Sequence, residues 1–332
     1  MSRNSLIKYV LSLCLMAMCW MTMTAEETSM RGDVCRDGTV NINDVTSLID
    51  YLLNTNVTGL DVAAADVNDD GDVNISDVTA LVDFLLSGEW PYVIEPLEFT
   101  VSGVTFKMIP VEGGTFIMGG SEDDPYVKPW ELPAHQVTLS DYYIGETEVT
   151  QALWRAVMGS NPSWFCSTNG YTNDLKRPVE KVKYSDCTQF LSKLKQKTGQ
   201  AFRLLTDAEW EYAARGGKRT HGYMFPGSND IEEVAWHAGN SNEITHAVGS
   251  KAPNELGIYD MGGNVGEWCS DWFGYYTAEA QTNPTGPTTG QCRVVRGGSW
   301  NQAWRMNRVS YRYDGIPSNN TIHVGLRLAL SM

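Results

Sequence analysis

The sequence predicts an α+β protein with much irregular structure, preceded by a small all-α module. Three observations carry this prediction. A polar loop followed by an apolar helical pattern occurs twice between residues 31 and 88. Alternating and helical apolar patterns follow one another between residues 99 and 216. Beyond that point Gly, Asn, Pro and Trp dominate, so we expect long irregular connections.

The composition is that of a globular protein with a cation-binding rather than a nucleic-acid-binding character. The chain has 332 residues, 42% of them hydrophobic and 20% charged, which is enough for about two domains. Its 40 Asp and Glu against 25 Lys and Arg give a net charge of −15. Because phosphate contacts need a surplus of basic side chains, no nucleic-acid partner is expected.

Residues 1–25 have the pattern of a signal peptide. Arg3 and Lys8 precede a short apolar run, and a small residue closes the segment. We therefore expect a protein that is secreted, periplasmic or exposed at the cell surface. A lipoprotein anchor at Cys14 or Cys19 is the less favoured alternative, because bulky residues precede both cysteines. No stretch reaches the ~20 apolar residues of a membrane-spanning helix.

The repeat has the spacing of calcium-binding loops. DVCRDGTVNINDVTSLIDYLL starts at Asp33, and DVNDDGDVNISDVTALVDFLL starts at Asp66. Oxygen donors recur at alternating loop positions around a glycine at position 6, as in EF-hands, although each loop ends in Asp rather than Glu. The predicted calcium ligands are Asp33, Asp37, Thr39, Asn41 and Asp44 in the first loop and Asp66, Asn68, Asp70, Asp72, Asn74 and Asp77 in the second. Cys35 takes position 3 of the first loop, and because sulfur is a poor Ca²⁺ ligand we expect that site to be the weaker.

With one clear helix after each loop, residues 31–88 resemble a type I dockerin, a calcium-folded module. They hold eleven Asp and two Arg, so much of the chain's negative charge lies here. The resemblance implies a partner that carries a cohesin, contacted by loop positions 10 and 11, which are Ile42, Asn43, Ile75 and Ser76. A calcium-stabilised spacer without a cohesin partner is the alternative.

Residues 89–98 form a predicted linker, and a second domain spans residues 99–332. We expect two strands around Gly113-Gly114, then one strand in HQVTLSDYYIGETEVT and a helix over 151–158 capped by Thr150. Ser185 is the expected cap of a helix through Lys197. A strand in FRLL should precede a helix that begins with a capping box of Thr206 and Glu209.

The motifs of this second domain resemble those of the formylglycine-generating enzyme family, also called sulfatase-modifying factors. They are PVEGGTFIMGG, HQVTLSDYYIGETEVTQALWRAVMG, RLLTDAEWEYAARGG, ELGIYDMGGNVGEWCSDW, RVVRGGSW and VGLRLAL, in this order between about residues 104 and 330. The resemblance implies the fold of that family, a variant of the C-type lectin fold.

Members of this family oxidise a sulfatase cysteine to formylglycine with O₂ and a copper ion held by two cysteines, three and eight residues after the serine of GGS. Here that serine is Ser299, and the two positions are Gln302 and Asn307. Neither amide supplies the thiolate that selects Cu(I), so copper is not expected. Ser299 remains a candidate residue of the active-site groove.

The same resemblance implies a calcium site in IYDMGGNVGEW. Its ligands would be the side chains of Asp260 and Glu267 and the carbonyls of Gly263 and Val265. A polar turn capped by these acids is the alternative.

The basic, tryptophan-rich segment 293–312 is interpreted as structural. We expect Arg296, Arg308 and Arg327 to pair with buried acids rather than to form a nucleic-acid patch. Cys269 and Cys292 are expected to be structural, and no disulfide is assigned.

Two classes of function follow. The first is a calcium-stabilised binding or scaffold module that holds a peptide, such as a sulfatase segment, or a glycan, in an extracellular complex that degrades polysaccharides. The second is an active formylglycine-generating oxidase. The loss of both copper ligands favours the first class.

Overall fold

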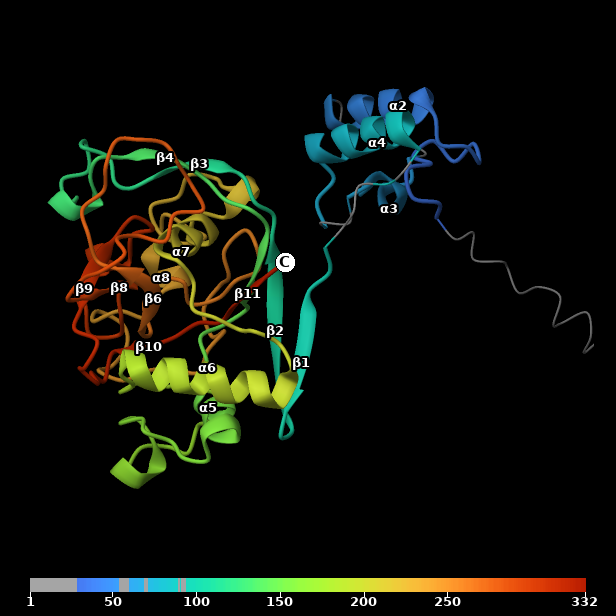
Figure 1. The fold of residues 1–332 in the computed structure, drawn as a ribbon. Coiled ribbons are helices and arrows are strands. Elements are labelled where there is room, and N and C mark those ends of the chain that lie inside the picture. Colours follow the sequence, from blue (N-terminus) through green and yellow to red (C-terminus); the bar gives the residue numbers. More distant parts are fainter. Residues whose placement is uncertain (1–28, 54–59, 69–70, 89, 91–93) are drawn as a thin grey trace, which may run out of the picture. The chain divides into compact units, whose positions relative to one another are not determined.

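The computed structural model describes residues 29–53, 60–68, 71–88, 90 and 94–332, and the predicted signal peptide lies outside them. The chain divides into two units, Met1–Ile94 and Glu95–Met332, each with its own core. Helices and sheets are both present (Figure 1), so the prediction of an α+β protein is confirmed. Among the described residues, no helix has the length and hydropathy of a membrane span.

Among the described residues of the first unit, the regular secondary structure is helical and the calcium-loop residues form turns. Helices α2 (Ile42–Leu53) and α4 (Ile75–Ser87) follow the two loops, as predicted, and pack side by side (Figure 1). Their shared core includes Val45, Leu48, Val78 and Leu81. The sequence analysis missed the short helix α3 (Val62–Ala65), whose first turn is capped by Asp61.

The second unit contains three sheets. The first has the strand order β1-β2-β5-β11 and is antiparallel throughout, with β1 at Leu97–Val101, β2 at Val104–Val111, β5 at Tyr142–Gly145 and β11 at Ala329–Ser331. The second has the order β10-β6-β8-β9, with β10 at Val324–Gly325, β6 at Gly266–Trp272, β8 at Arg293–Arg296 and β9 at Arg312–Gly315. The third joins β3 (Thr115–Met118), β4 (His135–Thr138) and β7 (Gln281–Thr282).

Four α-helices connect these sheets: α5 (Gln151–Met158), α6 (Tyr184–Thr198), α7 (Asp207–Ala214) and α8 (Ile231–Val234). Helices α5 and α6 pack together (Figure 1). The rings of Trp154 in α5 and Phe190 in α6 stack with their centres 4.9 Å apart. Helix α7 contacts β3, β6 and β8. It therefore lies at the centre of the domain, where its acidic residues can reach the second sheet.

Two helix caps follow the sequence prediction. Thr150 Oγ1 accepts a hydrogen bond from the N–H of Leu153 at the start of α5. At α7, Thr206 Oγ1 accepts from the N–H of Glu209, and Glu209 Oε2 accepts from the N–H of Thr206, which completes the capping box. These contacts span three residues, so local sequence is sufficient to specify them.

Three expectations about local structure are wrong. Helix α6 begins two residues earlier than expected, with Lys183 rather than Ser185 at the cap position, and Asp186 accepts a hydrogen bond from the N–H of Lys183. The expected strand in FRLL is reduced to a single bridge between Arg203 and Ala329. The segment from His135 forms two strands in different sheets, because the chain turns between β4 and β5.

Candidate functional site: the segment between β8 and β9

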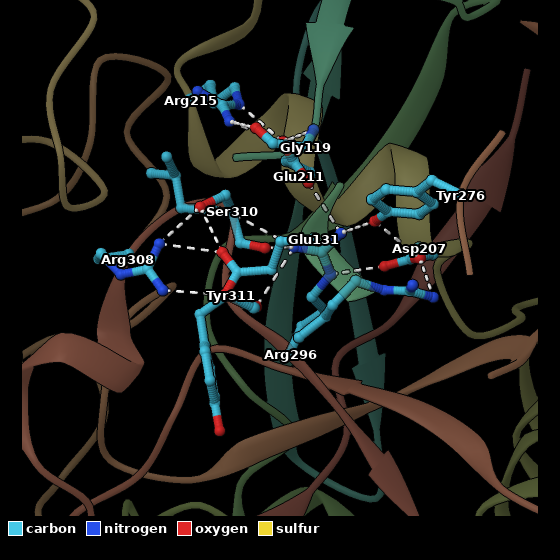
Figure 2. A network of polar contacts seen from close by, with 12 residues as sticks. Gly119, Glu131, Asp207, Glu211, Arg215, Tyr276, Arg296, Arg308, Ser310 and Tyr311 are labelled. Atoms are coloured by element: carbon cyan, nitrogen blue, oxygen red, sulfur yellow. Dashed lines mark hydrogen bonds and ion pairs between the residues drawn. The ribbon is translucent and has the colours of Figure 1, made fainter. Parts of the chain in front are cut away.

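The buried guanidinium of Arg296 joins the second sheet to α7. Its Nε lies 2.5 Å from Asp207 Oδ1, and its Nη2 lies 2.8 Å from Glu211 Oε2 (Figure 2). Burial alone would raise the pKa of Asp207, but Arg296 and Arg312 hold that pKa below its ordinary value. Both carboxylates are therefore ionised partners of a fixed cation, with no proton to exchange at neutral pH.

Arg308 forms a second buried cluster in the same segment. Its Nη2 lies 2.9 Å from Glu131 Oε1, and Ser310 donates to Glu131 Oε2 (Figure 2). Arg308 Nη1 also lies 2.7 Å from Asp124 Oδ2. Farther along the chain, Arg327 Nη2 lies 2.7 Å from Glu267 Oε1.

The three arginines singled out from the sequence thus all pair with buried or mostly buried acids, and the prediction of a structural role is confirmed. Their charge is neutralised inside the domain.

The segment between β8 and β9 borders two hollows. The first, which we call the aromatic hollow, has a volume of about 390 Å³ and is lined by Trp164, Phe165, Tyr171, Ala238, Ser241, Glu243, Trp300, Asn301 and Ile322. Trp164 is 41% exposed, and Lys181 Nζ lies 5.3 Å from the centre of its ring. Large aromatic faces with a few polar groups at their edge suit the binding of a sugar or of an extended peptide.

The second hollow, the arginine hollow, has a volume of about 770 Å³. Arg215, Tyr223, Met224, Arg308 and Ser310 are among the residues that line it. Its arginines are already paired, Arg215 with Glu211 and Arg308 with Glu131, so the hollow has no free cation among its described residues.

Ser299, Gln302 and Asn307 belong to the same segment, but none of them lines either hollow. Ser299 is fully buried and its Oγ donates to Asn301 Oδ1 at 2.9 Å, so it supports a lining residue rather than lining a hollow itself. Asn307 is also buried, and its Nδ2 donates to the carbonyl of Trp304 at 3.2 Å, within the 3₁₀ turn η4 (Trp304–Asn307). The side-chain carbonyl oxygens of Gln302 and Asn307 have no hydrogen-bond partner among the described residues.

No described cysteine offers an activated thiolate in place of the two cysteines expected at positions 302 and 307. The five thiols in the described part of the chain are unpaired, and burial raises the pKa of Cys269 well above its ordinary value. Cys269 lies inside β6, and Cys292 directly precedes β8. No group of three metal-ligating side chains is found in the described part of the large unit.

The predicted calcium loop supports the GGS turn. The N–H of Gly263 donates to the carbonyl of Gly297 at 2.7 Å, and the N–H of Trp300 donates to the carbonyl of Asn264 at 2.8 Å. Glu267 is engaged by Arg327 and by the indole N–H of Trp210, which donates to Oε2 at 2.7 Å. Asp260 accepts from the N–H of Gly249 through Oδ2, while its buried Oδ1 has no described partner.

Three buried carboxylates face one arginine at this loop. Burial raises the pKa of Asp260 to about 6, and Glu267 adds to that rise. Burial and the charges of Asp260 and Glu267 also raise the pKa of Glu148, whose Oε1 accepts from the N–H of Val265. An excess of buried negative charge with an unpartnered Asp260 oxygen fits a hard cation, so the residues present are compatible with the predicted Ca²⁺.

In the first unit, backbone N–H groups organise the carboxylates of both loops. Asp44 accepts from the N–H groups of Cys35 (3.0 Å) and Asn41 (2.8 Å), and Asp77 accepts in the same way from Val67 (2.7 Å) and Asn74 (2.8 Å). Asp33, at position 1 of the first loop, accepts from the N–H of Gly38. The predicted ligands in the described residues are Asp33, Asp37, Thr39, Asn41 and Asp44 in the first loop and Asp66, Asn68, Asp72, Asn74 and Asp77 in the second, while Asp70 lies outside the described residues.

The predicted partner-binding residues lie where these loops enter the helices. Ile42 is 64% exposed at the start of α2, and Ile75 is 66% exposed at the start of α4. Asn43 and Ser76 follow them and are also exposed. Two exposed isoleucines at equivalent positions form a repeated apolar feature on a small, strongly acidic module.

Sequence reasoning missed most of the aromatic hollow. Trp164, Tyr171 and Glu243 come from two long connections and meet Trp300 only in the folded chain. The one available signal was PSWF, in which large aromatic residues interrupt a polar, turn-forming stretch.

Comparisons with known proteins identify the family of each part of the chain. Residues 99–332 match the family of the sulfatase-modifying factor enzyme 1-like domain, and residues 31–86 match the dockerin type I domain. The formylglycine-generating enzyme of Streptomyces coelicolor is 30% identical over 286 residues, covering 68% of this chain and 89% of that protein. The chaperone protein LppX of Paenibacillus barcinonensis is 31% identical over 258 residues, covering 63% and 83%.

Two solved structures share the fold. The Treponema denticola variable protein 1 has a TM-score of 0.64 at 33% identity, and PvdO from Pseudomonas aeruginosa has a TM-score of 0.62 at 27% identity. Each comparison covers 72% of this chain and 100% of the other. The match over residues 99–332 and the shared fold show that the chain belongs to the formylglycine-generating enzyme (sulfatase-modifying factor) family and carries a type I dockerin, a calcium-binding module, ahead of the family domain.

Proposed function

We propose that this protein is an exported binding or scaffold module rather than an oxidase. The observation that carries the proposal is the pair Gln302 and Asn307 at the positions where the family's copper cysteines are expected. Amide groups do not stabilise Cu(I), and buried Asn307 is hydrogen-bonded into its own turn. Copper is therefore not assigned to this chain, and no oxidation step is derived for it.

The aromatic hollow is the proposed ligand site. Trp164, Tyr171 and Trp300 offer apolar faces, while Glu243 and Asn301 offer polar groups at the edge. A peptide, such as a sulfatase segment, or a glycan has this combination of flat or apolar surface and hydrogen-bonding groups.

Calcium has a structural role in this proposal. In the dockerin, the loop carboxylates repel one another, and a bound cation offsets that repulsion. In the large domain, Asp260, Glu267 and the carbonyls of Gly263 and Val265 would hold an ion beside the GGS turn. Calcium would then stabilise the backbone below the aromatic hollow. Such an ion should raise the melting temperature of wild type, and Asp260→Asn should remove that part of the increase.

The dockerin would attach the module to a cohesin-bearing scaffold protein. Ile42 and Asn43, or their equivalents Ile75 and Ser76, supply the contact surface. With the signal peptide predicted over residues 1–25, this assembly would be exported, and the polysaccharide-degrading complex is the setting that the dockerin resemblance implies. The alternative is a spacer without a cohesin partner, and measuring the binding of the protein to an immobilised cohesin distinguishes the two.

The first experiment tests the oxidase alternative. The full-length protein, folded and loaded with calcium, is incubated with a sulfatase-motif peptide, Cu(I), reductant and O₂, and the peptide is analysed by mass spectrometry. We expect no aldehyde, and no copper retained after desalting. Conversion of the cysteine by the wild-type chain would refute the binding-module proposal.

A double variant, Gln302→Cys with Asn307→Cys, is the matched control. It restores two thiols at the positions that the family resemblance assigns to copper, so we expect it to retain one Cu(I) per chain where wild type retains none. Ligand binding is tested separately with arrays of peptides and polysaccharide fragments. Trp164→Ala should weaken any ligand that binds the aromatic hollow, whereas Tyr275→Ala, at an exposed aromatic residue absent from its lining, should not.

A further inference from the structure

The two loops of the dockerin differ at one ligand position. Position 3 is Asn68 in the second loop and Cys35 in the first. The rest of the first loop keeps its oxygen donors, and Asp33, Asp37 and Asp44 are all present. Because Ca²⁺ prefers six to eight oxygen ligands, a thiol at position 3 removes one ligand and places a soft atom beside the ion.

The structure brings the thiol into a compact donor group. One ligand atom each from Asp33, Cys35 and Asp37 lies within 4.8 Å of the other two, and no other group of three such side chains is found among the described residues. Cys35 is partly exposed, and its sulfur is unpaired. The loop geometry is held by backbone contacts, since the N–H of Cys35 donates to Asp44 Oδ1 and the N–H of Asp37 donates to Asp33 Oδ1.

A second observation independently identifies this turn as a metal-binding loop. Residues 31–86 match the type I dockerin, and the second loop repeats the same spacing with oxygen ligands only. One thiolate and two carboxylates form a three-ligand set that suits tetrahedral Zn²⁺, with water in the fourth position. Binding would release the thiol proton to solvent, which makes the affinity depend on pH.

We propose that the first dockerin loop binds Zn²⁺ or a similar thiophilic divalent cation through Asp33, Cys35 and Asp37, while the second loop binds Ca²⁺. The two metals would hold the two halves of one module. Folding of the dockerin would then require both cations. This inference does not depend on the ligand or activity of the large domain.

The test uses the full-length protein and Co²⁺ as a spectroscopic substitute for Zn²⁺. Wild type should show a thiolate-to-cobalt charge-transfer band that one equivalent of Zn²⁺ removes and excess Ca²⁺ does not. Cys35→Asn, which copies the second loop, should lose the band. Cys292→Ser, at the other partly exposed thiol, should keep it.

Metal content measured by native mass spectrometry gives an independent readout. Cys35→Asn should bind one more Ca²⁺ than wild type, and its Zn²⁺ affinity should fall at least about tenfold. A wild-type chain without the band, or with equal Ca²⁺ content and equal Zn²⁺ affinity in the variant, would overturn the inference. If Cys35→Asn fails to fold, alkylation decides: Zn²⁺ and not Ca²⁺ must protect Cys35 of the wild-type protein from iodoacetamide.

Discussion

Arg308 and Glu131 are 177 positions apart in the chain, yet they face each other as a two-point pair inside the protein. Arg308 Nη1 lies 2.9 Å from Glu131 Oε2, and Arg308 Nη2 lies 2.9 Å from Glu131 Oε1. Both side chains are almost completely buried. The pair holds the irregular stretch that precedes β9 (Arg312–Gly315) against η1 (Pro129–Glu131), and Arg308 itself lines the arginine hollow.

Removing one member of this pair should destabilise the domain strongly. Glu131→Gln leaves the buried Arg308 with Asp124 as its remaining carboxylate, and we expect a loss of about 3 kcal/mol in the free energy of unfolding. Urea denaturation measures it. Glu146→Gln is the control, because its pair with Lys107 is exposed and should contribute less than ~1 kcal/mol. Equal effects of the two variants would contradict the structural role of Arg308.

Metal removal should loosen the dockerin. The carboxylates of Asp44 and Asp77 are fully buried at the ends of the two loops, so chelation leaves repelling charges without a cation. We expect amide hydrogen exchange in α2 and α4 to rise when EDTA is added and to fall again when metal is restored. Unchanged protection after complete metal removal would show that the module folds without ions.

Cohesin binding should depend on the two exposed isoleucines together. In the double variant Ile42→Asp, Ile75→Asp, both copies of the apolar contact are lost, and we expect affinity for an immobilised cohesin to fall by at least about 100-fold. Each single variant should lose less than about tenfold, because the other copy remains available. Since both side chains are exposed, unfolding free energies should stay within about 0.5 kcal/mol of wild type. A double variant that binds normally would exclude this surface.

The stability of the large domain should change with the ionisation of Glu180. Burial raises the pKa of Glu180 from 4.5 to about 7, despite hydrogen bonds from the N–H of Phe165 and its neighbour. A raised pKa means that the folded state holds the proton more tightly than the unfolded state does. The contribution of protonated Glu180 to the free energy of unfolding is therefore complete below about pH 4.5 and is lost as the pH rises to about 7.

Glu180→Gln removes this dependence, because an amide does not ionise. Relative to wild type, the variant should gain stability between pH 4.5 and 7, by up to about 3 kcal/mol. Urea denaturation at a series of pH values measures the difference. Glu98→Gln, at an exposed carboxylate of β1, is the control and should show no such trend. A constant difference between Glu180→Gln and wild type across this range would contradict the assignment.

Features that depend on neighbouring residues could be predicted from the sequence. The capping box of Thr206 and Glu209, the cap at Thr150 and the end of α6 at Gly199, which has a φ of +76°, all involve contacts within four residues. The dockerin loops are similar, since their ligand spacing is a property of twelve consecutive positions. FRLL shows the limit of this reasoning, because its strand-like pattern forms only one bridge, at Arg203.

The sequence by itself determined the two-part organisation, the family and the absence of cysteines at Gln302 and Asn307, because these follow from the order and identity of residues along the chain. Tertiary structure alone decided which acid pairs with each arginine, that Ser299 is buried, and that Trp164, Tyr171 and Trp300 line one hollow. The physical reason is distance along the chain. Asp207 and Arg296 are 89 positions apart, and only the packing of α7 against the second sheet brings them together.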